Sequence, residues 1–365
     1  MATVPLGDDP VQSDARGSRT SGSAPRTKRR RSAAKRGQNL YGWIFVSPAL
    51  AILVIFLVIP IFLALYISFT NWSGITSPFS SAVHFVGLRN YKAILTKPGL
   101  SQLNFGTAVR NNFYYVIFVV PLQTALSLWL AILVNNKFLK GKSFFRTAFY
   151  FPSVTSSVAI TTVFIFLFSG TGAVNRILSL FGITGPNWIY DQSGIFTTIL
   201  SSLGVHNPPS WANFQILGLS LWNWLAGPSF GMCVIIILAI WTTSGTFMLF
   251  FLAALQNISE EAEEASEMDG ATSWQKFRYV TLPMLRPMVV LVATLGFIGT
   301  WQVFDQSFLT GPNNPTMVTP AFLAYQVSFS DFAFGEGAAI AFMLFALIVV
   351  LTILQRKFVK EDLTK

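Results

Sequence analysis

The sequence predicts an all-α membrane protein whose chain crosses the bilayer as six transmembrane helices. Hydrophobic residues make up 52% of the 365-residue chain and charged residues only 11%, whereas soluble globular chains carry about 25% charged residues. Six apolar runs are also each near or above the roughly 20 residues that a helix needs to cross a bilayer. Runs of this length cross as helices, because the lipid offers no partner to an unpaired backbone group.

The segment before the first apolar run, residues 1–38, predicts a disordered basic tail in the cytoplasm. Large apolar residues are almost absent from it, so it cannot bury a core. A basic cluster from Arg26 to Arg36 ends just before the first run. A signal peptide is the rival interpretation, but the apolar run is too long for its hydrophobic region and no small-residue cleavage site is evident. We therefore expect the cluster to keep the N-terminus inside.

The six apolar runs divide the remaining chain into spans and loops. We expect spans at about 41–69, 112–134, 148–168, 230–255, 287–308 and 337–354. Together with their connections they form a transmembrane domain over 39–360, followed by a short tail at 361–365. The connections are three outer loops, at 70–111, 169–229 and 309–336, and one long cytoplasmic loop at 256–286. In the second outer loop, the semi-apolar pieces 195–205 and 214–225 are too short to span, so we expect surface amphipathic helices or a re-entrant element.

Basic residues beside the spans predict that both termini lie in the cytoplasm. Two connections on one side and the flank after the last span carry them: Lys137, Lys140, Lys142 and Arg146; Lys276, Arg278 and Arg286; and Arg356, Lys357 and Lys360. The first outer loop departs from this rule with Arg89, Lys92, Lys97 and Arg110. That loop is about 40 residues long and the other flanks agree, so the orientation stands as the expectation.

Several function classes are disfavoured by what the sequence holds. The net charge of +10 is concentrated in the tail and the span flanks, where it sets topology and does not indicate nucleic-acid binding. The two histidines, His84 and His206, fall in separate outer loops, without metal-ligand spacing or a Ser/His/Asp arrangement. We therefore expect no enzyme site, and no metal or cofactor bound by this chain. The single cysteine, Cys233, lies in an apolar run and is expected to be a small packing residue.

A phosphate-binding loop is also disfavoured. Gly141-Lys142-Ser143 has the ending of that motif, but Asn136 occupies the position where the motif requires glycine. We therefore do not expect this chain to bind ATP through this motif.

The cytoplasmic loop contains a polar and acidic stretch, 259–287, between two apolar runs. Ser259 is placed to cap a short helix, and Gly270 can end it in a left-handed conformation. Thr272 and Gln275 form a capping-box pattern that opens a second short helix. Small and apolar residues recur at helical spacing in the first helix: Ile258, Ala262, Ala265 and Met268. We expect two short helices with a bend between them, held just outside the membrane.

The spacing within this loop resembles the EAA loop of ABC-importer permeases. Glu264-Ala265-Ser266 is followed after three residues by Gly270 and after nine more by Val280-Thr281-Leu282-Pro283. Ser266 and Val280 stand where the family pattern has Ala and Ile, while Asp269 and Arg286-Pro287 are similar to its carbohydrate-uptake branch, the maltose/trehalose type. The resemblance implies a coupling helix that docks on the ATPase subunit. The implied coupling residues are Glu264, Ala265, Ser266, Asp269, Gly270, Leu282 and Pro283.

The end of the fifth run, Trp301 to Pro312, resembles a second family pattern. Phe304-Asp305, Leu309-Thr310-Gly311 and Pro315-Thr316 match the FD….LTGG.P..T pattern of one sugar-permease subunit type, with Pro312-Asn313-Asn314 in place of a glycine-rich turn. At helical spacing one face would carry Phe297, Trp301, Phe304 or Asp305, and Phe308. We expect Trp301, Phe304, Asp305 and Gln306 to line the substrate path, because rings stack on sugars and polar groups bind hydroxyls. A packing face with an interfacial aromatic belt is the competing interpretation.

The resemblance implies a type I ABC-importer permease fold over roughly 40–360, apart from the second outer loop. Its implied function is the import of a sugar or sugar derivative across the bacterial cytoplasmic membrane by alternating access. The implied partners are a second permease in a heterodimer, an ATPase dimer that binds ATP and Mg, and an extracytoplasmic solute-binding protein. An integral-membrane enzyme is an alternative that would need a catalytic cluster. An ion channel or secondary transporter would explain the spans but not the acidic loop.

Overall fold

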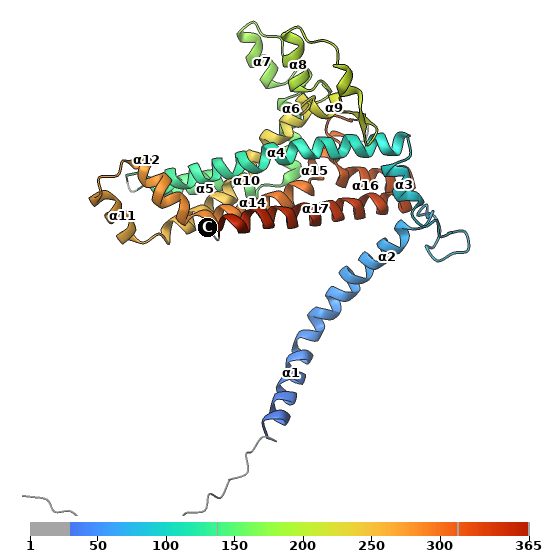
Figure 1. Ribbon diagram of the computed structural model, residues 1–365, viewed down its shortest axis with the longest axis horizontal. Coiled ribbons are helices and arrows are strands. Elements are labelled where there is room, and N and C mark those ends of the chain that lie inside the picture. Colours follow the sequence, from blue (N-terminus) through green and yellow to red (C-terminus); the bar gives the residue numbers. More distant parts are fainter. Residues whose placement is uncertain (1–29, 137, 312–313, 364–365) are drawn as a thin grey trace, which may run out of the picture. The chain divides into compact units, whose positions relative to one another are not determined.

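The computed structural model describes residues 30–136, 138–311 and 314–363, and these are mostly helical (Figure 1). The strands of this part form one small hairpin, β1 (Gln215–Ile216) and β2 (Leu219–Ser220), which pair antiparallel with Gln215 opposite Ser220. The chain divides into two units, Met1–Pro60 and Ile61–Lys365.

The described part of the first unit is helical. Helix α1 (Arg30–Leu53) leads into a π-helical turn, η1 (Val54–Val58), and then into α2 (Ile59–Ser68), most of which belongs to the second unit. The sequence predicts disorder through residue 38, but the helix begins at Arg30, where alanines and lysine favour its extension. Residues 1–29 of the expected tail lie outside the described residues.

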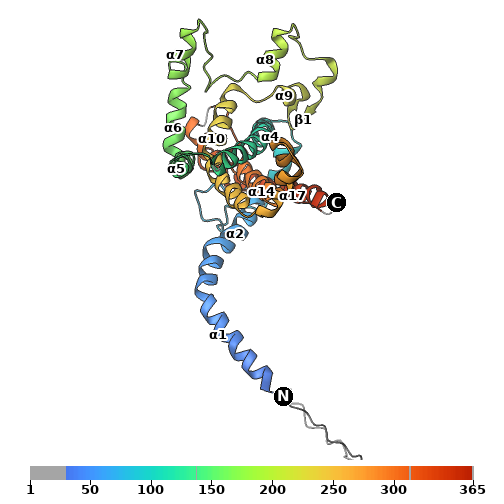
Figure 2. The same cartoon turned by 90° about the vertical axis from the view of Figure 1, so that its left-hand side faces the viewer.

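Four long helices form the centre of the second unit: α4 (Leu100–Asn135), α10 (Phe230–Gln256), α14 (Arg286–Trp301) and α17 (Phe334–Leu363). Helix α4 packs against α10 and α14, and α14 also packs against α17 (Figures 1 and 2). Helix α4 begins well before the expected start at residue 112, so the first outer loop is shorter than predicted. Phe105, Ala108 and Val109 supply a buried face at helical spacing and explain the extension.

Shorter elements connect these four helices. On the path to α10 they are α3 (Arg89–Leu95), α5 (Lys142–Val154), α6 (Ser157–Leu167), α7 (Ala173–Leu180), α8 (Ile195–Ser202), η2 (Ser210–Asn213) and α9 (Leu221–Leu225). After α10 they are α11 (Glu260–Met268), α12 (Ser273–Lys276), η3 (Phe277–Thr281), α13 (Leu282–Met284), α15 (Asp305–Thr310) and α16 (Pro320–Phe329). The sequence did not indicate α16, which lies within the expected third outer loop.

The long outer loop is built from short pieces. The first expected amphipathic piece, 195–205, contains α8, whereas the second, 214–225, becomes the β-hairpin followed by α9. Leu217 and Gly218 both have positive φ, at 50° and 76°. Two consecutive residues of this kind make the tight turn that matches the twist of a hairpin.

Five helices of the described part are long and apolar enough to cross a membrane, and the bent pair α5 and α6 raises the number to six. This agrees with the six predicted spans, with two corrections. The third span, expected as one helix over 148–168, starts at Lys142 and bends by 91° between Val154 and Ser157. The fifth, expected over 287–308, breaks after Trp301 and resumes as α15. Polar residues lie at both breaks, and the prediction did not allow for their tendency to interrupt a helix.

Close packing of α10 on α5 depends on one glycine. A Cβ added to Gly245 would lie 2.9 Å from the Cα of Tyr150 and closer still to the carbonyl oxygen of Phe149. The obstacle is backbone, so it cannot move aside as a flexible side chain could. We expect Gly245→Ala to destabilise the chain by about 1–3 kcal/mol, the usual cost of overpacking.

The matched control is Gly299→Ala, also in a helix but with open space around the added Cβ. It should be neutral or slightly stabilising, since alanine favours helix over glycine by about 1 kcal/mol. Thermal unfolding in detergent measures both. Equal melting temperatures for the two variants would contradict the packing account.

Candidate functional site

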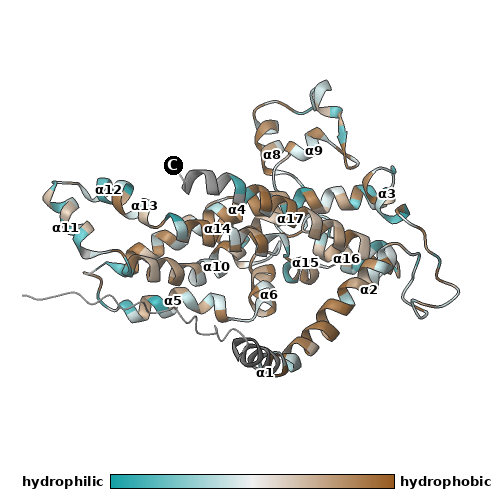
Figure 3. Cartoon of the chain, turned by 60° about the horizontal axis from the view of Figure 1, so that its bottom comes forward, coloured by the Kyte–Doolittle hydropathy of each residue, from teal (hydrophilic) through white to brown (hydrophobic). Residues whose placement is uncertain are grey.

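A bent segment that contains α11, α12, η3 and α13 joins α10 to α14, and we call its residues 259–284 the acidic elbow. It carries hydrophilic residues beyond one end of the long helices (Figure 3). Ser259 caps α11 as predicted, its Oγ accepting from the Ala262 N–H at 3.4 Å. The helix ends at Met268, and Gly270, two residues later, has a φ of 73°. The N–H groups of Gly270 and Ala271 donate at 3.0 Å to the carbonyls of Glu267 and Ser266, the paired bonds that end a helix through a left-handed residue.

The second helix is fixed to the first. The predicted capping box is present: the Thr272 N–H donates to Gln275 Oε1 at 2.8 Å, and the Gln275 N–H donates to Thr272 Oγ1 at 3.4 Å. Lys276 Nζ then lies 3.0 Å from Glu267 Oε1, which joins α12 to α11. The bend between the helices is therefore set by hydrogen bonds at both of its ends.

The acidic elbow presents exposed apolar side chains among its carboxylates. Met268, Trp274 and Tyr279 are 88%, 66% and 72% exposed. Glu264, Ala265, Asp269 and Gly270 are exposed as well, Ser266 is buried, and Leu282 and Pro283 belong to α13. Leu285 and Ile258 pack at the two ends against a cluster of α4 and α10 residues, so the elbow has a firm base. Large exposed apolar side chains on a fixed surface are a feature that binding surfaces share.

The first cavity in the bundle is lined mostly by hydroxyl groups. It has a volume of about 350 Å³. Its lining residues are Pro152, Ser153, Thr155, Ser157, Ile160, Thr161, Leu238, Thr242, Thr243, Thr246, Phe247 and Gln306. We call it the hydroxyl cavity, and it lies against the 91° bend between α5 and α6.

Serine and threonine chemistry accounts for the bend. Ser153 Oγ donates to the Tyr150 carbonyl at 2.7 Å, and Thr155 Oγ1 donates to the Phe151 carbonyl at 3.0 Å. Such bonds back to the helix, next to Pro152, favour bending and interruption. Non-helical backbone at membrane depth is tolerated only where it is buried in protein or lines a cavity. The backbone at the break lines such a cavity, through Ser153, Thr155 and Ser157.

A second cavity adjoins the first and shares Thr243, Phe247 and Gln306 with it. It measures about 320 Å³, and we call it the glutamine cavity because Gln123, Gln302 and Gln306 all line it. The break between α14 and α15 borders it, through Gln302, Val303 and Phe304. Two interrupted helices thus meet at one pair of cavities, the arrangement by which transporters build solute sites.

Gln123 is the most constrained polar group of the glutamine cavity. Its side chain is fully buried, and its Oε1 accepts from Thr243 Oγ1 at 2.6 Å. Its Nε2 has no hydrogen-bond partner among the described residues. A Cβ on Gly296 would collide with that nitrogen, so the glycine makes room for the amide. A buried donor without a partner is costly, which favours an oxygen of a bound solute or of water at this point.

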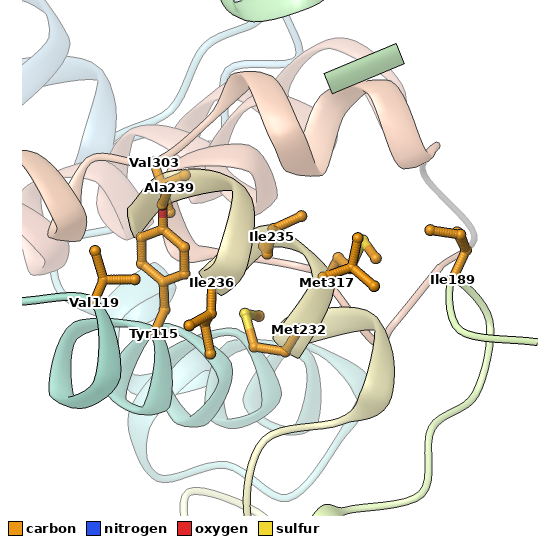
Figure 4. Close-up of a cluster of buried hydrophobic side chains, with 10 residues drawn as sticks. Tyr115, Val119, Ile189, Met232, Ile235, Ile236, Ala239, Val303 and Met317 are labelled. Carbon is orange, nitrogen blue, oxygen red and sulfur yellow. The ribbon is translucent and has the colours of Figure 1, made fainter. Parts of the chain in front are cut away.

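An apolar cluster borders the glutamine cavity. Tyr115, Val119, Ala239 and Val303 line it and also belong to the cluster shown in Figure 4. In that cluster α10 contributes Met232 and Ile235, and the chain after α15 contributes Met317. Hydrogen bonds hold this chain segment in place, since Ser307 Oγ donates to the Met317 carbonyl at 2.6 Å.

Three of the four residues predicted for the substrate path line the glutamine cavity: Phe304, Asp305 and Gln306. Trp301 is placed differently. It is 2% exposed and packs with Val116 and Leu344, and it is not among the lining residues of the two cavities. The expected single helical face does not exist, because the helix ends at Trp301.

The sequence prediction missed Gln123, Thr161 and Thr243. Each is a polar residue within an apolar run, and Thr161 Oγ1 is another buried group without a partner in the described chain. Intramembrane polar residues face cavities or protein partners, so their position in the runs was the available signal. Which of them share a cavity depends on how the helices pack, and the sequence does not show that.

Comparison with known proteins identifies the family to which this chain belongs. Residues 123–361 match the model of the "Binding-protein-dependent transport system inner membrane component" family. The chain is 30% identical to the lactose transport system permease protein LacF of Rhizobium radiobacter, over 89% of this chain and 96% of the relative. It is 31% identical to the arabinooligosaccharides transport system permease protein AraP of Halalkalibacterium halodurans, over 87% of each chain.

The fold is similar to that of a solved bacterial ABC transporter involved in the import of the acidic polysaccharide alginate. The TM-score is 0.68 at 18% identity, covering 92% of this chain and 99% of the other. A second structure of the alginate transporter, in complex with an alginate pentasaccharide-bound periplasmic protein, matches equally well. These likenesses show the fold, and the predicted type I ABC-importer permease fold agrees with them.

Proposed function

The chain belongs to the family of inner-membrane components of binding-protein-dependent transport systems, and from that membership we propose that it is the permease subunit of an ATP-driven importer of sugars. The pair of cavities at two interrupted helices is the observation that carries the proposal. Its walls offer what a neutral sugar needs: many hydroxyl groups, glutamine amides and the ring of Phe304.

A hydroxylated solute matches the cavities better than an ion does. Ser, Thr and Gln side chains exchange hydrogen bonds with hydroxyl groups in either direction. Asp305, in the glutamine cavity, is the single acidic or basic side chain among the lining residues of the two cavities. The relatives named for lactose and for arabinooligosaccharides support the same solute class.

Coupling to ATP is proposed for the acidic elbow. Its fixed bend and exposed apolar side chains suit a cleft on a separate ATPase dimer, which would hold the ATP and Mg. Glu264, Ala265, Ser266, Asp269, Gly270, Leu282 and Pro283 are the residues assigned to this contact. We further propose a second permease subunit as the partner in the membrane and an extracytoplasmic binding protein on the opposite face.

The proposed orientation has both termini and the acidic elbow in the cytoplasm, as the basic flanks suggest. A cysteine at exposed position 273, introduced as Ser273→Cys in a Cys233→Ser background, should be labelled by a membrane-impermeant maleimide only after the membrane is opened. Labelling of intact cells at that position would reverse the proposed orientation. A cysteine at exposed Ser193, in the second outer loop, serves as the positive control for intact cells.

The test of the function uses the chain assembled with its partner subunits. ATP hydrolysis by the purified complex should rise when the binding protein is added together with its sugar, and the sugar is found by a thermal-shift screen of that binding protein. If the sugar-loaded binding protein does not change the ATPase rate of the complex, whichever sugar is used, the result would count against an importer. A secondary transporter would move solute without any ATPase subunit.

A further inference from the structure

The basic residues of the first outer loop depart from the charge rule that the other flanks follow. The segment 70–111 holds Arg89, Lys92, Lys97 and Arg110 and no acidic residue. Helix α3, which carries Arg89 and Lys92, lies at the end of the long helices opposite the acidic elbow (Figure 1). The proposed transport does not use these charges, so they require another explanation.

Three of the four cations line one pocket. It has a volume of about 660 Å³, and its lining residues are Asn71, Val86, Leu88, Arg89, Asn90, Lys92, Ala93, Lys97 and Glu336. We call it the basic pocket. Three cations and one carboxylate give a formal charge of 3 − 1 = +2. Within the described residues no ion pair joins these cations to Glu336 or to another carboxylate, so their charge is available to a ligand.

The walls of the basic pocket are held firmly. Asn90 Nδ2 donates to the carbonyls of Ser68 and Thr70, both at 2.9 Å. Ile94, on the other side of α3, is fully buried. At the end of α17 that holds Glu336, the Gly335 N–H donates to the Trp72 carbonyl at 3.0 Å. The backbone that carries the cations is therefore held in place, while the side chains of Arg89, Lys92 and Lys97 are themselves exposed.

The basic pocket follows the first span closely enough in the chain to lie at the level of the lipid headgroups. The first candidate span, Tyr41–Ser68, has 28 residues, which measures about 42 Å at 1.5 Å per residue. That equals the roughly 40–45 Å of a bilayer with its headgroups. Asn71 follows this span by three residues, and Lys97 precedes α4 by three.

Exposed apolar side chains lie near the cations in the sequence. Those of Phe79, Phe85, Leu88 and Leu100 are 73%, 69%, 57% and 77% exposed. Cations beside exposed aromatic and leucine side chains are the composition of segments that lie in the membrane interface, where acyl chains cover the apolar groups and phosphates meet the cations. An acidic protein surface would pair with the cations but would not cover these apolar side chains.

We propose that the basic pocket binds the headgroup of an anionic phospholipid in the outer leaflet. Arg89, Lys92 and Lys97 surround its phosphate, and Glu336 accepts a hydrogen bond from a headgroup hydroxyl such as those of phosphatidylglycerol. The bound lipid holds α3 and the start of α17 at the membrane surface. This inference goes beyond the proposed function. It rests on that function only for the orientation, which places the first loop on the outer side of the membrane.

The test is native mass spectrometry of the full chain in detergent, titrated with equal amounts of phosphatidylglycerol and phosphatidylcholine of identical acyl chains. The wild type should retain phosphatidylglycerol in preference. Each cation near a lipid surface is worth roughly fivefold in binding, so the triple variant Arg89→Gln, Lys92→Gln and Lys97→Gln should lose at least about tenfold of the preference. Inorganic phosphate at the same concentration should not displace the lipid.

Two further variants sharpen the result. Arg176→Gln, an exposed outer-loop cation that does not line the basic pocket, should leave the preference unchanged. Glu336→Gln should increase it, because the formal charge of the pocket rises to +3 from the +2 of its lining. The proposal is overturned if the triple variant retains the wild-type preference, or if the wild type shows none. It is also overturned if the triple variant only weakens the response of the assembled ATPase to the binding protein, since the pocket is then a protein contact. Melting temperatures of the variants verify that each remains folded.

Discussion

Gly270→Val is expected to uncouple the transporter from its ATPase while the transmembrane helices stay folded. Gly270 has a φ of 73°, and a Cβ there would meet open space. The obstacle is therefore the backbone conformation and not crowding. A left-handed residue other than glycine costs about 1–2 kcal/mol, or about a 5- to 30-fold shift away from the observed bend, and β-branching makes valine a poor occupant.

The loss should appear as reduced co-purification of the ATPase and reduced uptake, with an unchanged melting temperature for the chain. Gly270→Asn is the matched control, because asparagine enters the left-handed region more readily than valine, and it should keep most of the coupling. Glu264→Lys should also weaken ATPase binding, since it reverses a charge on the exposed face of α11. Normal uptake with both Gly270→Val and Glu264→Lys would show that the acidic elbow does not couple.

Gln306→Ala is expected to raise the solute concentration at which uptake is half-maximal, without releasing the ATPase. Gln306 lines both cavities. Loss of one hydrogen bond to a neutral hydroxyl costs about 0.5–1.5 kcal/mol, roughly 2- to 12-fold in affinity. Phe304→Ala should have a larger effect, because it removes a stacking surface and also leaves a void. Phe304 packs with Phe308 and Tyr325 at centroid distances of 5.5 Å each.

Trp301→Phe separates solute contact from packing. Trp301 is buried beside Val116 and Leu344, so its replacement should lower the melting temperature and leave the half-maximal concentration unchanged. If Gln306→Ala and Phe304→Ala instead disrupt the assembled complex and the surviving complex responds to solute like the wild type, the residues form a subunit interface and not a solute path.

Local chemistry made the acidic elbow predictable from the sequence. Its caps and bend depend on residues within three or four positions of each other, such as Ser259 with Ala262 and Thr272 with Gln275. The six spans followed from length and composition in the same way. These features need no knowledge of which helices touch.

The cavities were harder to predict, because they depend on packing between distant residues. Gln123 and Thr243 share a hydrogen bond across 120 positions of the chain, and only the packing of α4 on α10 brings them together. Trp301 was misplaced for a related reason. A continuous 3.6-residue period was assumed through a helix that ends at that residue, so its side chain and that of Phe304 face different neighbours.

The most direct test of the central claim is uptake into proteoliposomes that contain the chain with its partner permease and ATPase, with the sugar-loaded binding protein outside. The account predicts labelled sugar inside the vesicles only when ATP can reach the ATPase subunits, and little uptake by the Gly270→Val transporter under the same conditions. Uptake that proceeds without ATP, at the same rate in the wild type and in Gly270→Val, would contradict it.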